Sequence, residues 1–176
     1  MKVVALALAC LTLLAGCGED QQAAAPPPPA ALTREAVGHY CGMVVVDHPG
    51  PKAQIFVADT PEPYWFTSVR DAIAFTLLPE EPRNITAFYV TDMGKSADWD
   101  NPQTWMPARD AVFVIGSARR GGMGQMEVVP FSERAAAERF IERNGGRVVT
   151  QAEIPQDYVL GEDQEGAGAT HGGAGH

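Results

Sequence analysis

The chain has 176 residues, of which 45% are hydrophobic, so it can bury the core of one compact domain or of two very small ones that share an interface. Its formal net charge at pH 7 is −9, and its Lys and Arg residues form no cluster that would neutralise phosphates. These values exclude nucleic acid as a partner class.

The first 16 residues are typical of a secretory signal peptide. Lys2 gives a short basic start, residues 3–14 form an apolar run, and two small residues precede Cys17. The run is shorter than the ~20 residues that a membrane-spanning helix needs, and no later segment approaches that length. We therefore expect residues 1–16 to be removed and the mature chain not to cross a membrane.

The cleavage region Leu14-Ala15-Gly16-Cys17 resembles a bacterial lipobox, in which processing leaves an acylated cysteine as the first residue. Acyl chains on Cys17 would anchor the protein at the periplasmic face of a membrane. Gly18 stands where an aspartate would direct retention in the inner membrane of enterobacteria, which favours the outer membrane but leaves the choice open. An ordinary signal peptide with an incidental cysteine is the alternative.

The cysteine count leaves one thiol in the mature domain. Cys10 departs with the signal peptide and Cys17 is taken by lipid, so only Cys41 remains and no internal disulfide is expected. A single cysteine in an oxidising compartment is expected to be buried, paired with another molecule, or engaged with a metal.

Two segments of low complexity flank the predicted domain. Residues 17–33, which include the run Pro26–Pro29, predict an extended spacer that carries the domain away from the membrane. Residues 156–176 predict a tail, and its glycine-rich part from Gly161 has too few apolar side chains to offset the entropy of ordering. We expect disorder in that part.

Residues 34–98 predict a first ββαβ unit. Cys41–Asp47 and Ala53–Ala58 are the expected strands of a hairpin, with a turn at residues 48–51. Ser68 and Asp71 have the spacing of a capping box before an apolar stripe, which predicts a helix, and residues 86–91 predict the closing strand.

The same order of elements is predicted again after a connecting loop at residues 99–110. The second unit, residues 111–155, has expected strands at 111–117 and 126–129, a helix that begins near Ser132 and stops at Asn144-Gly145-Gly146, and a last strand at 147–150. The predicted fold class is therefore α+β, with two small ββαβ units packed together as a pseudo-repeat. Neither unit of ~45 residues is expected to be stable alone.

The tripeptide Cys41-Gly42-Met43 is the most informative motif. On a strand, side chains at positions i and i+2 point to the same face, so the two sulfur atoms are expected to converge. A thiolate beside a thioether suits Cu(I) far better than Zn²⁺ or Mg²⁺. The alternative is that Cys41 is an apolar core residue and Met43 a flexible gap filler.

A closed trigonal copper site needs a third ligand. Met123 lies in a glycine-rich loop of the second unit, which the pseudo-repeat would bring opposite Cys41. His48, at the tip of the predicted hairpin, is the other candidate, although a single histidine in a turn is commonly only solvated. The sequence contains no catalytic triad signature, phosphate-binding loop or dinucleotide fingerprint.

One long stretch resembles a known family. Residues 41–55, Cys-Gly-Met-Val-Val-Val-Asp-His-Pro-Gly-Pro-Lys-Ala-Gln-Ile, are similar to the signature of the NosL family of nitrous-oxide reductase accessory lipoproteins. Shorter matches extend the resemblance over residues 35–154, and they are Tyr89–Met93, Met123-Gly124, Val129–Phe131 and Gly145-Gly146.

The resemblance implies a Cu(I) metallochaperone and not an enzyme, with two ββαβ units similar to part of organomercurial lyase. It implies delivery of copper toward an ABC transporter complex of the NosDFY type, and indirectly to the copper-sulfide centre of nitrous-oxide reductase. In the family the ion is expected at the Cys-Gly-Met sulfurs, here Cys41 and Met43, and at a downstream methionine, here Met123.

Two other functions stay open. One is an organometal-cleaving or thiol enzyme on the lyase-like fold, although organomercurial cleavage relies on more than one thiol and a carboxylate. The other is a purely structural lipoprotein.

Overall fold

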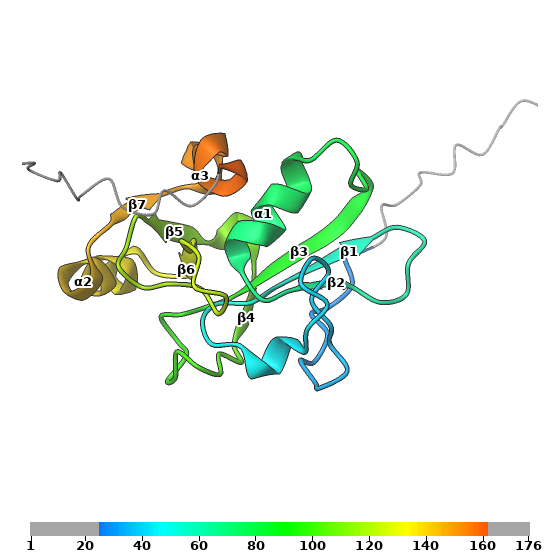
Figure 1. Ribbon diagram of the computed structural model, residues 1–176, viewed down its shortest axis with the longest axis horizontal. Coiled ribbons are helices and arrows are strands. Elements are labelled where there is room, and N and C mark those ends of the chain that lie inside the picture. The colour runs from blue at the N-terminus through cyan, green and yellow to red at the C-terminus, as the bar shows by residue number, and fades with distance from the viewer. Residues whose placement is uncertain (1–24, 162–176) are drawn as a thin grey trace, which may run out of the picture.

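The computed structural model describes residues 25–161 (Figure 1). The signal peptide, the lipidation candidate Cys17 and the glycine-rich tail from residue 162 lie outside the described residues. Among the residues described, none of the helices is long and apolar enough to span a bilayer. The elements in chain order are η1 (Val45–Asp47), β1 (Ala53–Val57), β2 (Tyr64–Phe66), α1 (Val69–Leu77), β3 (Ile85–Thr91), β4 (Trp105–Pro107), η2 (Ala108–Asp110), β5 (Val112–Ile115), β6 (Val129–Phe131), α2 (Arg134–Asn144), β7 (Arg147–Val149), η3 (Gln151–Glu153) and α3 (Gln156–Leu160).

The strands form two antiparallel sheets with related topologies. The first sheet has the order β2-β1-β3-β4 and the second has the order β6-β5-β7. In each sheet the first strand of the unit is flanked by its second strand and by the strand that follows the helix. The predicted α+β class with two ββαβ units is confirmed, and β4 is an additional edge strand in the connecting segment.

The first unit begins one strand later than predicted. The expected strand Cys41–Asp47 is wrong, because this segment forms a turn followed by the 3-10 helix η1. The strand that pairs with β1 is instead β2, with Gln54 opposite Trp65. The ββαβ order survives because the short aromatic segment Tyr64–Phe66 takes the place of the expected strand.

Both units contribute to one core. Ile55 and Phe66 of the first sheet, Phe75 of α1, and Phe113 and Val128 of the second unit belong to the same buried cluster. A second cluster lies between α2 and the second sheet, around Phe131 and Phe140. This sharing agrees with the expectation that neither unit is stable alone, and Figure 1 shows α1 and α2 packed on their respective sheets.

The second unit shows two shifts from the prediction. Its second strand is β6 at Val129–Phe131 rather than at 126–129, and α2 begins after Glu133 rather than after Ser132. The backbone NH of Ser132 donates to the Asp92 carboxylate (3.2 Å) instead. The predicted stop is confirmed, since Gly145 caps α2 with φ of 69°, a conformation that favours glycine.

The proline-rich segment lies on the outer face of the first sheet. Gln54, a fully buried side chain on β1, pairs with both backbone groups of Ala30: its Oε1 accepts from the NH (2.7 Å) and its Nε2 donates to the carbonyl (3.1 Å). The Tyr89 hydroxyl donates to the Pro27 carbonyl (2.6 Å), and Ala30 packs against the apolar side chains of this face. Residues 26–32 of the predicted spacer are therefore packed on the domain.

The folded part also extends beyond residue 155, where the predicted tail begins. Gln156–Leu160 form α3, which packs beside α1. The Tyr158 hydroxyl accepts from the Gly116 NH (2.9 Å) and donates to the Glu127 carbonyl (3.0 Å). These bonds fasten the end of the described chain to the second unit.

Candidate metal centre

Cys41 lies in a tight loop, although the sequence predicts a strand at this position. The Gly42 NH donates to the Gly38 carbonyl (2.8 Å), and the Gly38 NH donates to the Met43 carbonyl (2.8 Å). Gly42 has φ of 66°, which interrupts the extended backbone assumed in the prediction. Cys41 and Met43 thus flank a left-handed turn residue, and the strand argument for the convergence of their sulfur atoms does not apply.

The Cys41 thiol is half-buried and has a polar neighbour. Its Sγ lies 3.8 Å from the Thr67 hydroxyl oxygen, just before α1. A Cβ at Gly38 would lie 2.5 Å from the same sulfur, so glycine at this position leaves the space that the thiol occupies. The thiol is therefore held in a shaped and partly open cradle, and it is not sealed in the apolar core.

The loop that carries Cys41 is fixed to the first unit by its two preceding residues. The His39 NH donates to the Trp65 carbonyl (2.7 Å), and its ring lies edge-on to Tyr64 and Phe75. One carboxylate oxygen of Glu81 lies 3.2 Å from His39 Nε2 and accepts from the Tyr40 hydroxyl (2.9 Å). Burial, followed by the hydrogen bond to Glu81, raises the pKa of Tyr40, so its hydroxyl stays protonated and remains a donor.

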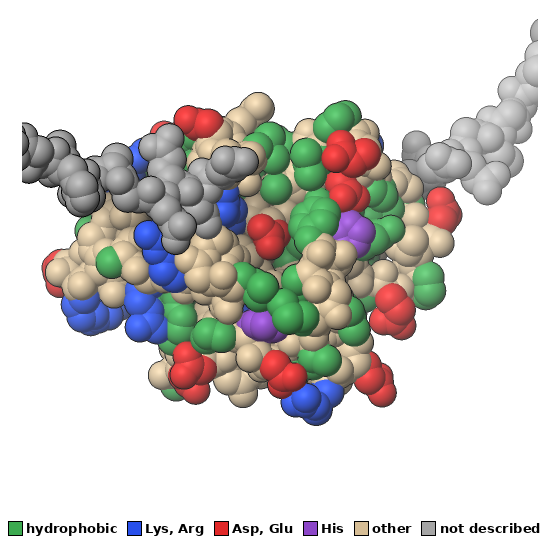
Figure 2. All heavy atoms as spheres, in the orientation of Figure 1, with side chains coloured by type: hydrophobic (Ala, Val, Ile, Leu, Met, Phe, Trp, Pro, Cys, Tyr) green, Lys and Arg blue, Asp and Glu red, His purple; other side chains and the backbone are tan. Residues whose placement is uncertain are grey.

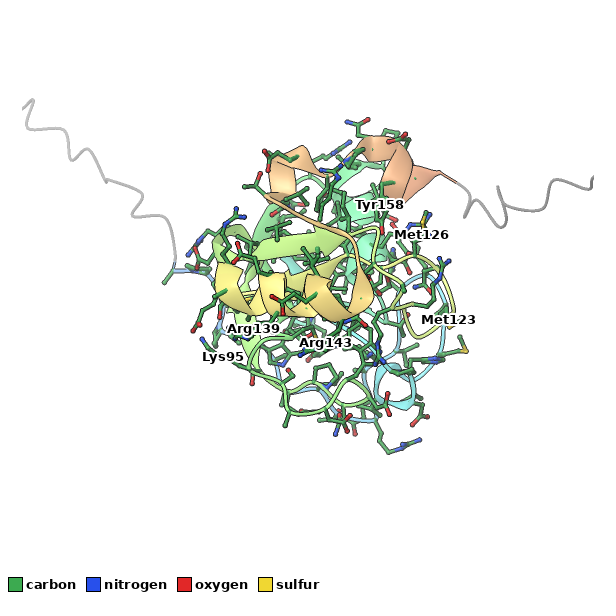
Figure 3. The ribbon with its side chains drawn as sticks, turned by 90° about the vertical axis from the view of Figure 1, so that its left-hand side faces the viewer. Lys95, Met123, Met126, Arg139, Arg143 and Tyr158 are labelled. Carbon is green, nitrogen blue, oxygen red and sulfur yellow. The ribbon has the colours of Figure 1, made fainter. Side chains whose placement is uncertain are left out.

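The structure brings the loop of Met123 against His48. A Cβ at Gly122 would lie 2.7 Å from His48 Cβ, so the glycine permits close contact between the two loops. Met123 is 48% exposed, and its NH donates to Gln125 Oε1 (3.1 Å). Figure 3 shows Met123 projecting outward from the same side of the molecule as Met126.

The candidate ligands therefore occupy two separate loop regions. Cys41 and Met43 belong to the loop of residues 38–43, whereas His48 lies against Gly122, the residue before Met123, where the loops of the two units meet. Within residues 25–161, no three His, Cys, Asp or Glu side chains are grouped so that they could hold a metal ion. On the face drawn in Figure 2, histidine side chains lie among hydrophobic side chains.

A buried carboxyl group lies beneath these loops. Glu127 is 1% exposed, and its Oε1 accepts from the Ser68 hydroxyl (3.1 Å), the Arg70 NH (3.1 Å) and the Val128 NH (2.8 Å). Burial raises the pKa of Glu127 to about 8, although these three hydrogen bonds favour the ionised form. Its Oε2 is buried and has no hydrogen-bond partner.

A buried amine belongs to the same region. Lys52 follows the His48 turn and is 1% exposed, and its Nζ donates to the Gly50 carbonyl (2.6 Å). Burial lowers the pKa of Lys52 to about 8, and the charges of Glu127 and Asp100 oppose that shift. The interface between the two units thus contains a buried acid, Glu127, close to a buried base, Lys52.

Sequence reasoning missed four residues that shape this region. Thr67 and Gly38 border the thiol, and Glu127 and Lys52 lie below the loops. Glu127 had a detectable signal, since it is an acid in an otherwise apolar segment that was predicted to be a strand. The other three become visible only when the tertiary contacts are known.

Fold and site together define a class of small α+β domains in which two ββαβ units present sulfur side chains from glycine-containing loops. The family model described as NosL matches residues 29–159. This chain belongs to the NosL family, as the stretch from Cys41 to Ile55 predicts.

Relatives of known description agree with this placement. A protein from Achromobacter cycloclastes described as "Copper-binding lipoprotein NosL" is 46% identical over 158 residues, covering 88% of this chain and 81% of the relative. A protein of the same description from Stutzerimonas stutzeri is 33% identical over 162 residues, covering 91% and 81%. The crystal structure of the copper chaperone NosL from Shewanella denitrificans matches with a TM-score of 0.69 and 36% identity, covering 74% of this chain and 98% of that one.

Proposed function

We propose that this protein is a Cu(I)-binding metallochaperone that supplies copper for the copper-sulfide centre of nitrous-oxide reductase. The observation that carries the proposal is the Cys41 thiol, half-buried in a cradle formed by Gly38 and Thr67 and free of any disulfide. Relatives at 46% and 33% identity are described as copper-binding lipoproteins, which supports copper as the cargo.

The proposed ligands are Cys41 and Met43 from one loop and Met123 or His48 from the adjoining loops. Thiolate and thioether sulfur are soft donors that favour Cu(I), and an imidazole nitrogen also suits copper. The thiol loses its proton when the ion binds, because the thiolate is the metal ligand. One thiolate and one Cu(I) then carry no net charge, which lowers the cost of holding the ion in a partly buried place.

Transfer, rather than chemical transformation of a substrate, is the proposed activity. The exposed position of Met123 leaves one side of the site open to ligand exchange with an acceptor. The proposed acceptor is an ABC transporter complex of the NosDFY type, through which copper reaches nitrous-oxide reductase.

Titration of the mature protein with Cu(I) in competition with a chromogenic chelator tests the proposal. We expect one tightly bound equivalent in the wild-type protein and none in Cys41→Ser. Met93→Leu is the matched control, because Met93 is a half-buried methionine whose Sδ accepts from the Thr91 hydroxyl (3.7 Å) and which packs against the apolar cluster of the second unit. Unchanged affinity in Cys41→Ser, or equal losses in both variants, would refute the assignment.

Membrane attachment through a lipidated Cys17 is the second part of the proposed function. We place the anchor at the periplasmic face, in the outer membrane. Metabolic labelling with a fatty-acid analogue is expected to mark the wild-type protein and not Cys17→Ser, which should leave the membrane fraction while Cu(I) affinity stays unchanged. Separation of inner and outer membranes then checks the location, and label in the inner membrane alone contradicts it.

A further inference from the structure

The Glu127 carboxyl group lies between a segment that borders the Cys41 thiol and the base of the Met123 loop. Its Oε1 accepts from the Ser68 hydroxyl and the Arg70 NH at the start of α1. Ser68 directly follows Thr67, whose hydroxyl contacts the Cys41 sulfur at 3.8 Å. One oxygen of Glu127 therefore fixes the segment that borders the thiol.

The other oxygen faces the base of the Met123 loop. A Cβ at Gly121 would lie 2.6 Å from Glu127 Oε2 and 2.8 Å from Gln125 Nε2, so both groups border the space left by this glycine. The Gly121 NH donates to the Gln125 carbonyl (2.9 Å), and Gln125 Oε1 accepts from the Met123 NH (3.1 Å). The carboxyl group thus lies directly under a short loop whose own bonds hold the Met123 backbone.

A third segment meets the other two at the same place. Lys52 places a buried amine near Glu127, and its Nζ donates to the carbonyl of Gly50, a residue that itself lies against Gly121. The turn that contains His48 is therefore joined to the same interface.

If Ser68 served only to cap α1, its hydroxyl would not need a buried carboxyl group as its partner. Ser68 occupies the N-cap position of α1, and serine is among the best capping residues, yet its hydroxyl makes no cap bond and donates to Glu127. A buried carboxyl oxygen without a donor is also costly. Glu127 carries this cost between the start of α1, which borders the thiol, and Gly121 at the base of the methionine loop.

We propose that Glu127 is a positioning residue that sets the placement of Met123 relative to Cys41, because its two carboxyl oxygens contact the supports of both loops. This inference rests on the proposed function, in which both sulfur atoms bind Cu(I).

A double-mutant cycle on the full-length mature protein tests the inference. Cu(I) affinity is measured by chelator competition for the wild type, Glu127→Gln, Met123→Leu and the double variant. We expect Glu127→Gln to lower the affinity about tenfold when Met123 is present and less than twofold in the Met123→Leu background. X-ray absorption of the copper-loaded Glu127→Gln protein is expected to show one sulfur neighbour fewer than the wild type.

Val128→Ala is the matched control, since Val128 is a fully buried neighbour whose truncation lowers stability without removing the carboxyl group. Its effect on affinity should be small and the same in both backgrounds. Should Glu127→Gln fold poorly, Ser68→Ala removes a single donor to Oε1 and is expected to show a weaker coupling of the same sign.

The outcomes separate this inference from the proposed function. Equal effects of Glu127→Gln in the two backgrounds, or a coupling as large for Val128→Ala, would overturn the positioning role. Unchanged Cu(I) affinity in Met123→Leu would overturn the positioning role as well. The proposed role of Cys41 as a copper ligand is tested separately, by Cys41→Ser.

Discussion

The two loops that carry the candidate sulfur ligands are held in different ways. The loop of residues 38–43 is bonded to β2 and to Glu81, with the His39 ring among aromatic neighbours. The loop of residues 121–125 is glycine-rich, bonds mainly to itself, and exposes Met123. The thiol thus has a fixed position in the first unit, whereas the methionine lies on a loop supported by a buried carboxyl group.

Under the proposed function, this difference would suit a site that both holds and releases Cu(I). The fixed thiolate would make the stronger contact, and the thioether on the exposed loop would be the ligand that an acceptor replaces first. We therefore expect perturbations of the Cys41 loop to lower Cu(I) affinity whether or not Met123 is present, and perturbations beneath the Met123 loop to lower it only through Met123 and to change stability as well.

The largest effect is expected from pH, through the acid beneath the Met123 loop. Because its pKa is raised to about 8, Glu127 retains a proton in the folded protein over a pH range in which the unfolded chain has lost it. The free energy of unfolding should therefore fall as pH rises from about 5 to 8, by at most about 1.4 kcal/mol per pH unit from this group.

Urea denaturation of the copper-free wild type and of Glu127→Gln at several pH values in this window checks the prediction. The difference between the two proteins should change with pH, and parallel curves would contradict the assignment. The series stops at pH 8. Above that value Lys52, whose pKa is lowered to about 8, is deprotonated in the folded protein but still protonated in the unfolded chain, so its effect makes the free energy of unfolding rise with pH.

A pair of glycine substitutions compares the two loops directly. In Gly38→Ala the new Cβ would lie 2.5 Å from Cys41 Sγ, so the thiol must move and Cu(I) affinity should fall about tenfold or more, which is at least about 1.4 kcal/mol. Gly124 has φ of 84° and open space around it, so Gly124→Ala adds backbone strain of about 1 kcal/mol without a steric clash. Chelator competition should show less than a threefold change for Gly124→Ala, and equal losses would remove the distinction between the loops.

A smaller effect is expected from the acid that holds the Cys41 loop. Glu81→Gln weakens the contacts of His39 and Tyr40, each of the order of 1 kcal/mol, and should speed alkylation of Cys41 by iodoacetamide several-fold. The neighbouring Glu80 is exposed, so Glu80→Gln serves as the control. Identical alkylation rates in the two variants would show that Glu81 does not restrain the loop.

The smallest effect is expected on the opposite face of the sheet. Tyr89→Phe removes the hydroxyl that donates to Pro27, and a single bond of this kind contributes roughly 0.5–1.5 kcal/mol. Hydrogen exchange at the Ala30 amide should become faster while Cu(I) affinity stays the same. A change in affinity would mean that the two faces are coupled, which the positions of the loops do not predict.

The topology was predictable because local signals repeat in the two units. The apolar stripe of α1, the strand before Asp92 and the glycine stop after α2 each appear where the pattern predicts them. The predicted strand stopped before Pro130, whereas β6 includes this residue. A proline fits there because β6 is an edge strand, where a missing backbone NH leaves no partner unpaired.

The local environment of the thiol was not predictable in the same way. The segment around Cys41 has the composition of a strand, but the left-handed Gly42 and the bonds to Gly38 turn it into a loop. The contact between Thr67 and Cys41 and that between Glu127 and Ser68 join residues far apart in the chain, which no local pattern encodes.

The docking of the proline-rich segment on the sheet sets the length of the proposed tether. If all residues from Cys17 to Thr33 were free, the leash could reach ~55 Å, whereas a leash that ends at Pro26 reaches at most ~30 Å. In Figure 3 the chain enters the described part on the side opposite to Met123. If Cys17 carries the proposed lipid anchor, a short tether on the side opposite to Met123 would favour orientations in which Met123 faces away from the bilayer, so an acceptor would have to extend beyond the lipid surface to reach the copper.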